Sequence, residues 1–367
     1  MQKGGKMRIL VLSNMYPSKR YPNYGVFVKN FVEKLLDENI NINIVCIKGR
    51  ENIKIKKICK YFIFIFKSIF CILRNNYDVI YIHYAEHSVF PLALIKVFYK
   101  IKKPIIINAH GDDVLSNSRV SKMVYSTIQS ASLIVVPSKY FYNIVLKKYS
   151  NPNIFISPSG GINLKIFNSK NSNLISNDNI IKLGYVSRID HGKGWDVLLK
   201  AIHVLVTKYN MINIKLTVIG CGNEEKDFLN MIDNLKINKY VYFLGVKKQN
   251  DLPEHYRNMD IFVFPSYRAG ESLGLAGLEA MACGVPVIGS KIGGIETYLI
   301  DNYNGFLFEP GDYNDLALKI VKFIKLDNIQ KKILIKNSIN TSKMYDNEIV
   351  NKKLIHKIKN TCENFYG

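Results

Sequence analysis

Two glutamates in the second half of the chain have the type and spacing to bind a polyhydroxylated, phosphorylated ligand. Glu271 and Glu279 lie eight residues apart within ESLGLAGLEAMACGVPVIGS. On a single helix they would stand about 80° apart, at roughly 100° per residue, and would not share one face. With Glu271 in a loop and Glu279 in the helix that follows, both can border one site. Carboxylates there accept hydrogen bonds from sugar hydroxyls.

The residues between the two glutamates predict a helix start that is open to an anion. The segment after Glu271 reads Ser272, Leu273, Gly274 and Leu275, and a helix is expected over 273–283, stopped by Gly284 and Pro286. Small residues leave the first backbone N–H groups of a helix accessible, and these groups favour a phosphate.

Two cations earlier in this half suit a diphosphate. Arg188 and Lys193 occur in GYVSRIDHGKGW, where glycines keep the backbone bare after an apolar run. Arginine binds phosphate as a fork and lysine as a point charge. The pattern predicts a diphosphate clamp.

The first half offers one candidate active-site histidine. His110 follows an apolar run in INAHGDD, at the carboxyl end of an expected strand, where doubly wound sheets bind ligands. His83 ends the preceding strand and is expected to be a satisfied structural histidine. Asp112 and Asp113 are expected to cap a helix rather than to bind a metal. We predict no metal site.

The elements that position these residues alternate between strand and helix in both halves. Short apolar runs predict strands over 7–13, 42–47, 78–83, 104–108, 133–137 and 154–157, then over 180–187, 215–219, 241–244, 261–265, 286–289 and 306–308. Helical patterns separate most of them. This order predicts an α/β fold with two doubly wound parallel sheets. No GxGxxG follows the first strand, which argues against a dinucleotide site.

The setting of the two glutamates resembles a known family. FPS before them, GLEAMACGVPVI around Glu279 and GGIE…NGFLFEPGD after them are similar to the signature of family 4 glycosyltransferases, which are retaining enzymes. The resemblance covers nearly the whole chain, tightly over 180–312 and loosely before. It implies the GT-B architecture, in which two Rossmann-like domains face each other across a cleft.

The resemblance also implies roles for individual residues. Glu271 would contact the transferred sugar and Glu279 the ribose, while Arg188 and Lys193 would hold the donor diphosphate. His110 would lie near the reacting sugar, so that Glu271, His110, Arg188 and Lys193 form the catalytic set. The other donor-binding positions would be Gly25, Gly245, Val246, Ser272, Leu273, Gly274 and Leu275. No metal or other cofactor is implied, because the nucleotide-sugar is a substrate.

Some positions depart from the family pattern. Ser159-Gly160-Gly161 replaces the usual Asn-Gly, Asn163 stands where Asp is expected, and Ile295 precedes Glu296 where proline is usual. The departures at 159–161 and at Asn163 lie near the expected hinge, so they concern the arrangement of the two domains rather than the donor site.

The chain is long enough for two hydrophobic cores. We predict an acceptor-binding domain over 1–168, a nucleotide-sugar-binding domain over 169–345, and a last helix, 346–367, that crosses back to the first domain. Asn168 to Asn179 is rich in Asn and Ser and has the composition of a linker.

Charge is concentrated in the first half of the chain. Residues 1–165 hold 25 Lys and Arg against 8 Asp and Glu, whereas 166–367 hold 26 against 21. A basic half indicates an anionic partner, either a membrane or a nucleic acid. Residues 54–74 place a cationic stripe beside a broad apolar arc, which is typical of an interfacial membrane helix and also fits a crossover helix packed on its sheet.

Other features bear on location. The apolar run after the first basic residues is too short for a signal peptide, and no run of about 18 apolar residues predicts a membrane span. The six cysteines show no disulfide or metal spacing. We expect a cytoplasmic protein that is peripheral on the inner face of the membrane.

These features together predict transfer of a hexose from a UDP- or GDP-sugar to a hydroxyl of a lipid-linked saccharide. The process would be surface polysaccharide synthesis, as for O-antigen, lipopolysaccharide or capsule. The alternatives are a GT-B nucleotide-sugar 2-epimerase, a basic nucleic-acid-binding protein and an inactive membrane scaffold.

Overall fold

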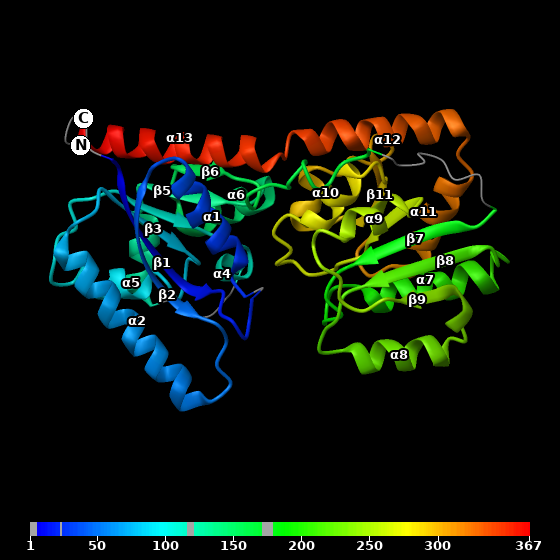
Figure 1. Cartoon of the computed structure of the whole chain (residues 1–367), viewed down its shortest axis with the longest axis horizontal. Helices are drawn as coiled ribbons and strands as arrows, with labels where there is room; N and C mark the ends of the chain where they lie inside the picture. The colour runs from blue at the N-terminus through cyan, green and yellow to red at the C-terminus, as the bar shows by residue number, and fades with distance from the viewer. Residues whose placement is uncertain (1–5, 23, 116–120, 171–178) are drawn as a thin grey trace. The chain divides into compact units, whose positions relative to one another are not determined.

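A computed structural model describes residues 6–22, 24–115, 121–170 and 179–367. The chain forms two compact units, one of residues 1–160 with 348–367 and one of residues 161–347. Within the described residues, each unit contains a six-stranded sheet whose strand pairs are all parallel (Figure 1). The predicted α/β class with two parallel sheets is confirmed.

The sheet of the first unit has the order β2-β1-β3-β4-β5-β6. Its strands are β1 (Arg8–Tyr16), β2 (Asn41–Lys48), β3 (Val79–His83), β4 (Ile105–Asn108), β5 (Leu133–Val136) and β6 (Ile154–Ile156). Its helices are α1 (Val26–Asp37), α2 (Lys54–Arg74), α3 (Phe90–Ile95), α4 (Asp112–Leu115), α5 (Lys122–Gln129), α6 (Lys139–Tyr149) and α13 (Asn347–Tyr366).

Alternate residues of these strands face opposite layers of helices. Leu10, Leu12 and Ile80 face one core, which includes side chains of α2, α3, α5 and α6. Ile9 and Val11 face the other core, which α1 and α13 complete.

The helix α13 completes a core made by the opposite end of the chain. Leu354, Ile355, Ile358 and Cys362 are buried with Met7 and with the outer faces of β1 and β3. Tyr366 donates a hydrogen bond to the carbonyl of Asp78 at 2.8 Å. The last helix therefore belongs to the first unit.

The sheet of the second unit has the order β12-β11-β10-β7-β8-β9. Its strands are β7 (Ile181–Val186), β8 (Ile214–Ile219), β9 (Val241–Phe243), β10 (Ile261–Phe264), β11 (Val287–Ser290) and β12 (Gly305–Phe308). Its α-helices are α7 (Trp195–Thr207), α8 (Glu225–Asn234), α9 (Leu252–Arg257), α10 (Leu275–Ala282), α11 (Tyr313–Ile324) and α12 (Asn328–Lys343). A short 3-10 helix, η2, spans Gly293–Thr297.

The first unit ends eight residues before the predicted boundary at 168. Ile162 accepts from the N–H of Asn347 and donates to the carbonyl of Tyr345, both at 2.8 Å. Phe167 is fully buried beside Tyr256 in the second core. These contacts tie 161–168 to the second unit. The predicted linker 168–179 lies largely outside the described residues.

The helix α10 begins at Leu275, two residues later than predicted. Gly274 is its N-cap and has a left-handed backbone, with φ of 77°. Ser272 and Leu273 therefore belong to the loop that carries Glu271.

Candidate active site

In the second unit, Lys193 and Glu271 form a direct ion pair. Lys193 lies in the loop after β7 and Glu271 in the loop after β10, and these two strands are paired neighbours. The Lys193 Nζ lies 2.7 Å from the Glu271 Oε2, and the two side chains are 13% and 11% exposed. Two of the predicted site residues thus meet at the carboxyl edge of the sheet.

Local hydrogen bonds hold both loops. The hydroxyl of Ser266, which follows the end of β10, lies 3.0 Å from the Glu271 Oε2 and 3.2 Å from the carbonyl of Gly192. The N–H of Tyr267 donates to the same carbonyl at 2.9 Å, and the Tyr185 hydroxyl donates to the carbonyl of Lys193 at 3.3 Å. The ion pair is therefore set in a network that fixes the backbone on both sides.

Behind the Glu271 loop, Gly294 permits a close backbone approach. Its N–H donates to the carbonyl of Glu271 at 3.2 Å. A Cβ at this position would lie 2.0 Å from the carbonyl oxygen of Ser272. Any side chain at 294 would push the loop out of place.

Arg188 does not join the Lys193–Glu271 pair. Its guanidinium lies 2.5 Å from the Asp190 carboxylate and its side chain is 57% exposed. Asp190 also accepts from the N–H of Asn223 at 2.8 Å, which links the loops after β7 and β8. The guanidinium of Arg188 is therefore accessible to a phosphate from solvent, whereas the Asp190 side chain is only 13% exposed.

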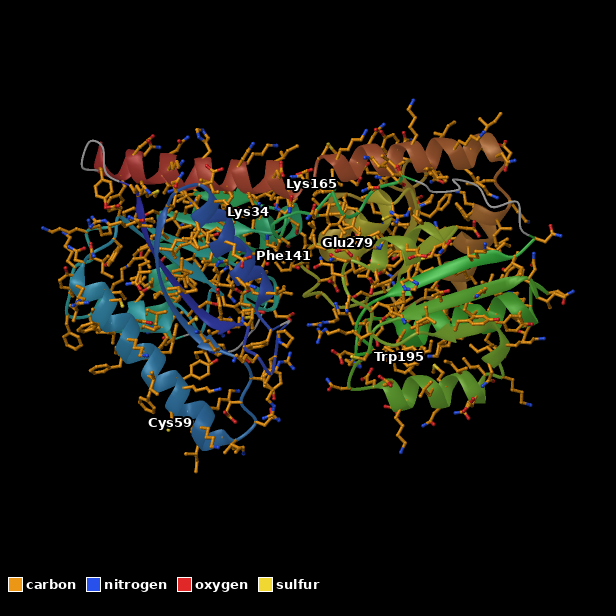
Figure 2. The ribbon with its side chains drawn as sticks, in the orientation of Figure 1. Lys34, Cys59, Phe141, Lys165, Trp195 and Glu279 are labelled. Atoms are coloured by element: carbon orange, nitrogen blue, oxygen red, sulfur yellow. The ribbon has the colours of Figure 1, made fainter. Side chains whose placement is uncertain are left out.

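Glu279 occupies the second turn of α10 and is only partly exposed. The hydroxyl of Tyr256 donates to its Oε2 at 3.1 Å. Burial raises the pKa of Glu279 to about 7, against the opposite effect of the Tyr256 hydrogen bond. Figure 2 labels Glu279 on α10. Within the described residues, no hydrogen bond or ion pair joins Glu279 to Arg188 or Lys193.

The remaining predicted donor-binding positions are mostly backbone sites. Gly245 follows β9, and its carbonyl accepts from the N–H of Gly220 at 2.9 Å. Val246 has a 63% exposed side chain, whereas Leu273 is fully buried and offers a ligand only its backbone. Ser272 and Leu275 are partly exposed around the N-cap of α10, Gly274.

In the first unit, His110 is paired with His83. The His83 Nδ1 lies 3.0 Å from the His110 Nε2, and the rings of Phe27 and Phe31 pack against the two imidazoles. Burial lowers the pKa of His110 to about 3, and burial together with His110 lowers the pKa of His83 well below its usual value. Both rings are neutral at neutral pH.

The pairing selects a tautomer of His110. The His83 Nε2 is buried and has no hydrogen-bond partner among the described residues. Because a buried N–H without a partner is the costlier defect, the favoured arrangement has the His83 proton on Nδ1, donating to His110. This arrangement keeps the His110 proton on its own Nδ1. His83, predicted as a satisfied structural residue, instead has one unmatched nitrogen and orients His110.

Asp113 holds the loop that carries His110. Its carboxylate accepts from the N–H groups of Ala85 at 2.7 Å, His110 at 2.9 Å and Gly111 at 2.8 Å. The N–H groups of His110 and Gly111 directly precede α4, as the predicted helix capping requires. The N–H group of Ala85 comes from the loop after β3, so Asp113 also joins two loops. Within the described residues, no group of three or more His, Cys, Asp or Glu gathers as metal ligands.

Gly25 is the N-cap of α1, with φ of 73°. A Cβ there would lie 2.8 Å from backbone atoms of Met15 and Tyr16. The glycine therefore allows the start of α1 to pack on the end of β1.

Sequence reasoning missed three contacts around these sites: Tyr256 with Glu279, Ser266 with Glu271, and His83 with His110. Of these, the contact between His83 and His110 could have been predicted from the order of the strands. His83 pairs with Asn108 in the parallel register of β3 and β4, so a histidine two residues beyond Asn108 must emerge at the same sheet edge.

Two family models match the chain. Residues 15–160 match Glycosyltransferase Family 4, and residues 166–341 match Glycosyl transferases group 1. The chain belongs to the group 1, family 4 glycosyltransferases and is an enzyme of the hexosyltransferase class.

Individual relatives agree with this assignment. An uncharacterized glycosyltransferase of Methanocaldococcus jannaschii is 28% identical over 88% of this chain and 91% of its own length. The capsular polysaccharide biosynthesis glycosyltransferase CapM of Staphylococcus aureus is 33% identical over 48% of this chain and 46% of its own.

Solved structures share the fold. The Anabaena protein HepE, in complex with UDP, superposes with a TM-score of 0.74 at 19% identity, over 96% of this chain and 100% of its own. The predicted GT-B fold class is confirmed.

Proposed function

We propose that this enzyme transfers a hexose from a nucleotide-diphospho-sugar to a hydroxyl of a lipid-linked saccharide, with retention of anomeric configuration, in surface polysaccharide synthesis. The observation that carries the proposal is the Lys193–Glu271 pair, an ammonium and a carboxylate 2.7 Å apart at one sheet edge. An ammonium suits the donor diphosphate, and a carboxylate suits sugar hydroxyls.

The chemistry needs charge stabilisation more than a nucleophile. The bond between the anomeric carbon and the β-phosphate oxygen breaks, and its electron pair stays on the nucleotide diphosphate. The acceptor oxygen bonds to the same face of that carbon, and its proton passes to the departing phosphate oxygen. Lys193 and Arg188 offset the developing negative charge, so we propose that no metal is required.

The donor side is supported by a structural neighbour. HepE has been solved with UDP and with UDP-glucose. We propose that Glu279 binds the ribose, that Gly245 and Val246 contact the base, and that the start of α10 contacts the phosphates.

The test is a thermal-shift screen of the full chain with UDP-sugars and GDP-sugars. A ligand that binds only the folded state raises the apparent stability, so at least one class must raise the midpoint. NMR of the product then reports the anomeric configuration. A panel without any shift, or an inverted product, contradicts the proposal. Conversion of nucleotide-sugar to its 2-epimer without acceptor would favour an epimerase.

The acceptor side is supported by the surface of α2. Apart from Ile63, its exposed apolar residues follow each other at spacings of three and four along one side of the helix: Ile55, Ile58, Phe62, Phe66, Phe70 and Leu73. We call them the apolar stripe of α2. The helix buries Phe64, Ser68 and Ile72 on its other side, so packing on the sheet leaves the stripe uncovered in this chain.

We propose that the apolar stripe lies in the surface of an anionic membrane. Lys54, Lys56, Lys57, Lys60, Lys67 and Arg74 belong to the same helix, and basic residues beside an apolar face favour anionic lipid. Among the described helices, none has a stretch long and apolar enough to cross a bilayer. The proposed placement is peripheral, on the cytoplasmic face, where a lipid-linked acceptor is within reach.

A further inference from the structure

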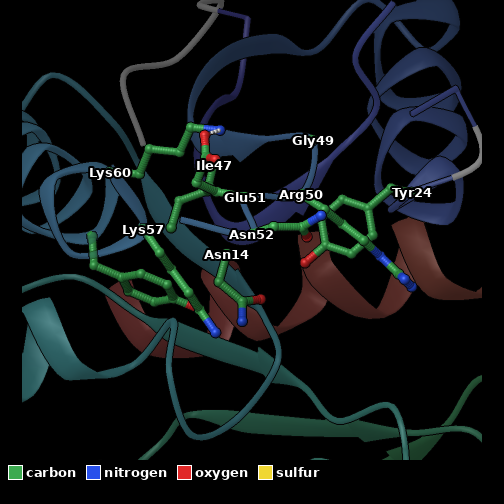
Figure 3. A pocket seen from close by; sticks show the side chains of 10 residues that line it. Asn14, Tyr24, Ile47, Gly49, Arg50, Glu51, Asn52, Lys57 and Lys60 are labelled. Carbon is green, nitrogen blue, oxygen red and sulfur yellow. Dashed lines mark ion pairs between the residues drawn. The ribbon is translucent and has the colours of Figure 1, made fainter. Parts of the chain in front are cut away.

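A basic pocket lies at the carboxyl edge of the first sheet. It has a volume of about 310 Å³ and lies between the ends of β1 and β2, the loop after β2 and the start of α2 (Figure 3). Its lining includes Asn14, Tyr24, Arg50, Lys57 and Lys60. Ser13, one residue before Asn14, pairs with His83 in the sheet register, so the pocket shares its sheet edge with the histidine pair.

The pocket carries an excess of positive charge. Its ionised side chains are Arg50, Lys57, Lys60 and Glu51, which leaves two net positive charges. Lys60 is neutralised by Glu51 at 3.4 Å, the ion pair that is dashed in Figure 3. Among the described residues, neither Arg50 nor Lys57 has a carboxylate within ion-pair distance. The guanidinium of Arg50 instead lies over the ring of Tyr24, 5.2 Å from its centroid.

A buried amide adds an independent sign of a ligand. Asn14 is only 6% exposed, and its Oδ1 has no hydrogen-bond partner among the described residues. A half-turn of the amide exchanges Oδ1 with Nδ2, so the group can present a donor or an acceptor. In Figure 3 the ends of Asn14 and Lys57 point in the same direction. A buried polar atom without a partner is unfavourable, so a ligand that hydrogen-bonds to the Asn14 amide would stabilise the pocket.

The charge count selects the ligand class. Each phosphate of a diphosphate that joins a lipid to a saccharide carries about one negative charge, as a phosphodiester does. Such a diphosphate would neutralise Arg50 and Lys57 together, whereas a carboxylate or a single phosphodiester would neutralise only one. The arginine fork also matches phosphate geometry.

The neighbouring surface indicates what the phosphate is attached to. Lys57, Lys60 and Tyr61 reach the pocket from the first two turns of α2. Ile58 and Phe62 of the apolar stripe, which are adjacent in sequence to Lys57 and Tyr61, are 55% and 68% exposed. An amphiphile with its phosphate in the pocket can therefore lay its hydrocarbon chain along α2.

We infer that this pocket binds the diphosphate of the lipid-linked acceptor, through Arg50, Lys57 and Asn14. The inference rests on the proposed function for its acceptor. It adds the site and the chemical group by which the acceptor is recognised.

The test uses geranyl diphosphate as the probe and calorimetry on the full chain. UDP and GDP are present in excess, so that a nucleotide occupies any diphosphate site of the second unit. Arg50→Gln and Lys57→Gln are each expected to weaken binding about tenfold. The matched control is Lys353→Gln, an exposed lysine of α13 in the same unit, which loses the same charge and is expected to bind as the wild type does.

Two further binding measurements show whether the pocket recognises a prenyl diphosphate, a free diphosphate or an anionic membrane surface. Inorganic pyrophosphate is expected to bind more weakly than geranyl diphosphate and to lose affinity in the same two variants. Anionic vesicles without prenyl phosphate are expected to bind Arg50→Gln, whose substituted residue lies outside α2, nearly as well as they bind the wild type. Equal losses in Lys353→Gln, or undiminished binding of geranyl diphosphate in Arg50→Gln and Lys57→Gln, would overturn the inference.

The outcome for the donor site is read separately. Both variants should keep the nucleotide-sugar thermal shift of the wild type, which also verifies folding. If the variants lose probe binding but the wild type shows no thermal shift with any nucleotide-sugar, the proposed function is wrong and the assignment of the pocket holds. If the wild type shows the thermal shift but the variants bind the probe as the wild type does, only the assignment of the pocket is wrong.

Discussion

The carboxylate of Glu271 has two close neighbours, the ammonium of Lys193 and the hydroxyl of Ser266. Both Lys193 and Glu271 are nearly buried, so the pair is screened little by solvent. Removing one partner of such a pair leaves a buried charge uncompensated. The position of the Glu271 carboxylate therefore depends on Lys193 before any ligand binds.

Replacing Lys193 with alanine is expected to lower turnover at least about tenfold, which corresponds to about 1.4 kcal/mol of transition-state stabilisation. The reason is loss of the charge that offsets the leaving diphosphate. Steady-state kinetics with the nucleotide-sugar found by thermal shift provides the measurement.

The control for this substitution is Lys226→Ala, an exposed lysine of α8, which should keep wild-type kinetics. Unfolding midpoints of both variants separate a catalytic loss from a folding defect. Wild-type turnover in Lys193→Ala would end the proposed role.

Glu279 is expected to make the second unit less stable as the pH rises. Its pKa is raised to about 7 in the folded chain, against about 4.3 when unfolded. Between these values the folded state binds the extra proton, so the free energy of unfolding falls from about pH 4.5 to pH 7. Glu279→Gln removes this contribution, and its stability relative to the wild type should increase with pH by on the order of 1–3 kcal/mol.

Fluorescence of Trp195 during urea unfolding measures this effect at pH 5 and pH 8. Trp195 is the single tryptophan of the chain and lies at the start of α7, in the same unit as Glu279 (Figure 2). Glu309→Gln, which removes an exposed ion pair with Lys291, is the control. A difference between Glu279→Gln and wild type that stays constant with pH would contradict the raised pKa.

At the scale of elements, α2 combines two surfaces. One buries Phe64, Ser68 and Ile72 against the first core, as a crossover helix must. The other is the apolar stripe, in which Phe62 is 68% and Phe66 76% exposed. The two interpretations of residues 54–74 are therefore compatible, because they concern opposite sides of one helix.

Removing the stripe's aromatic residues is expected to release the protein from anionic vesicles. Phe62→Ser together with Phe66→Ser should lower the bound fraction severalfold, because both rings lose their apolar burial. Lys56→Glu with Lys67→Glu should do the same by charge repulsion, and more strongly at low salt. Co-sedimentation with vesicles containing anionic lipid gives the bound fraction.

The matched control reverses the same number of charges elsewhere in the first unit. Lys352→Glu with Lys353→Glu alters two exposed positions of α13 and should leave vesicle binding nearly unchanged. If the control releases the protein as well as the α2 variants do, net charge rather than the stripe accounts for binding.

At the scale of the whole molecule, the two units have separate cores and only the second contains a tryptophan. Ile358→Ala, in the fully buried part of α13, should destabilise the first unit by about 2–5 kcal/mol. Circular dichroism should then show an earlier transition, while the transition seen by Trp195 fluorescence stays in place. A bound nucleotide-sugar should raise the midpoint of the transition that Trp195 fluorescence reports.

The exposed substitution Lys353→Ala serves as control for Ile358→Ala and should move neither transition. Coincident shifts of both transitions in Ile358→Ala would mean that the two cores unfold as one.

Much of this architecture follows from local patterns. Runs such as VIYIH and IFVF are short, apolar and bounded by turns, so the predicted strands end within one residue of those observed, except the first, which continues three residues beyond its predicted end to Tyr16. The predicted start of α10 is two residues too early. The spacing of apolar residues does not reveal that Gly274 has a left-handed backbone, which ends the loop and caps the helix.

The contacts between distant residues were harder to predict. Arg188 pairs with Asp190 through a loop conformation that no pattern encodes. Arg50 and Lys57 are ordinary surface cations in sequence and become a pocket only when the loop after β2 meets α2. The positions of Glu271 and Lys193 were predictable because each follows a strand of the same parallel sheet.

The return of α13 to the first sheet has a consequence for biosynthesis. The ribosome makes β1 before the strands of the second unit and Ile358 after them, yet β1 and Ile358 belong to one core. That core, which α1 covers in part, therefore lacks α13 until the second unit has all of its own strands. Nascent chains halted before residue 350 are expected to protect their later half from protease sooner than their earlier half.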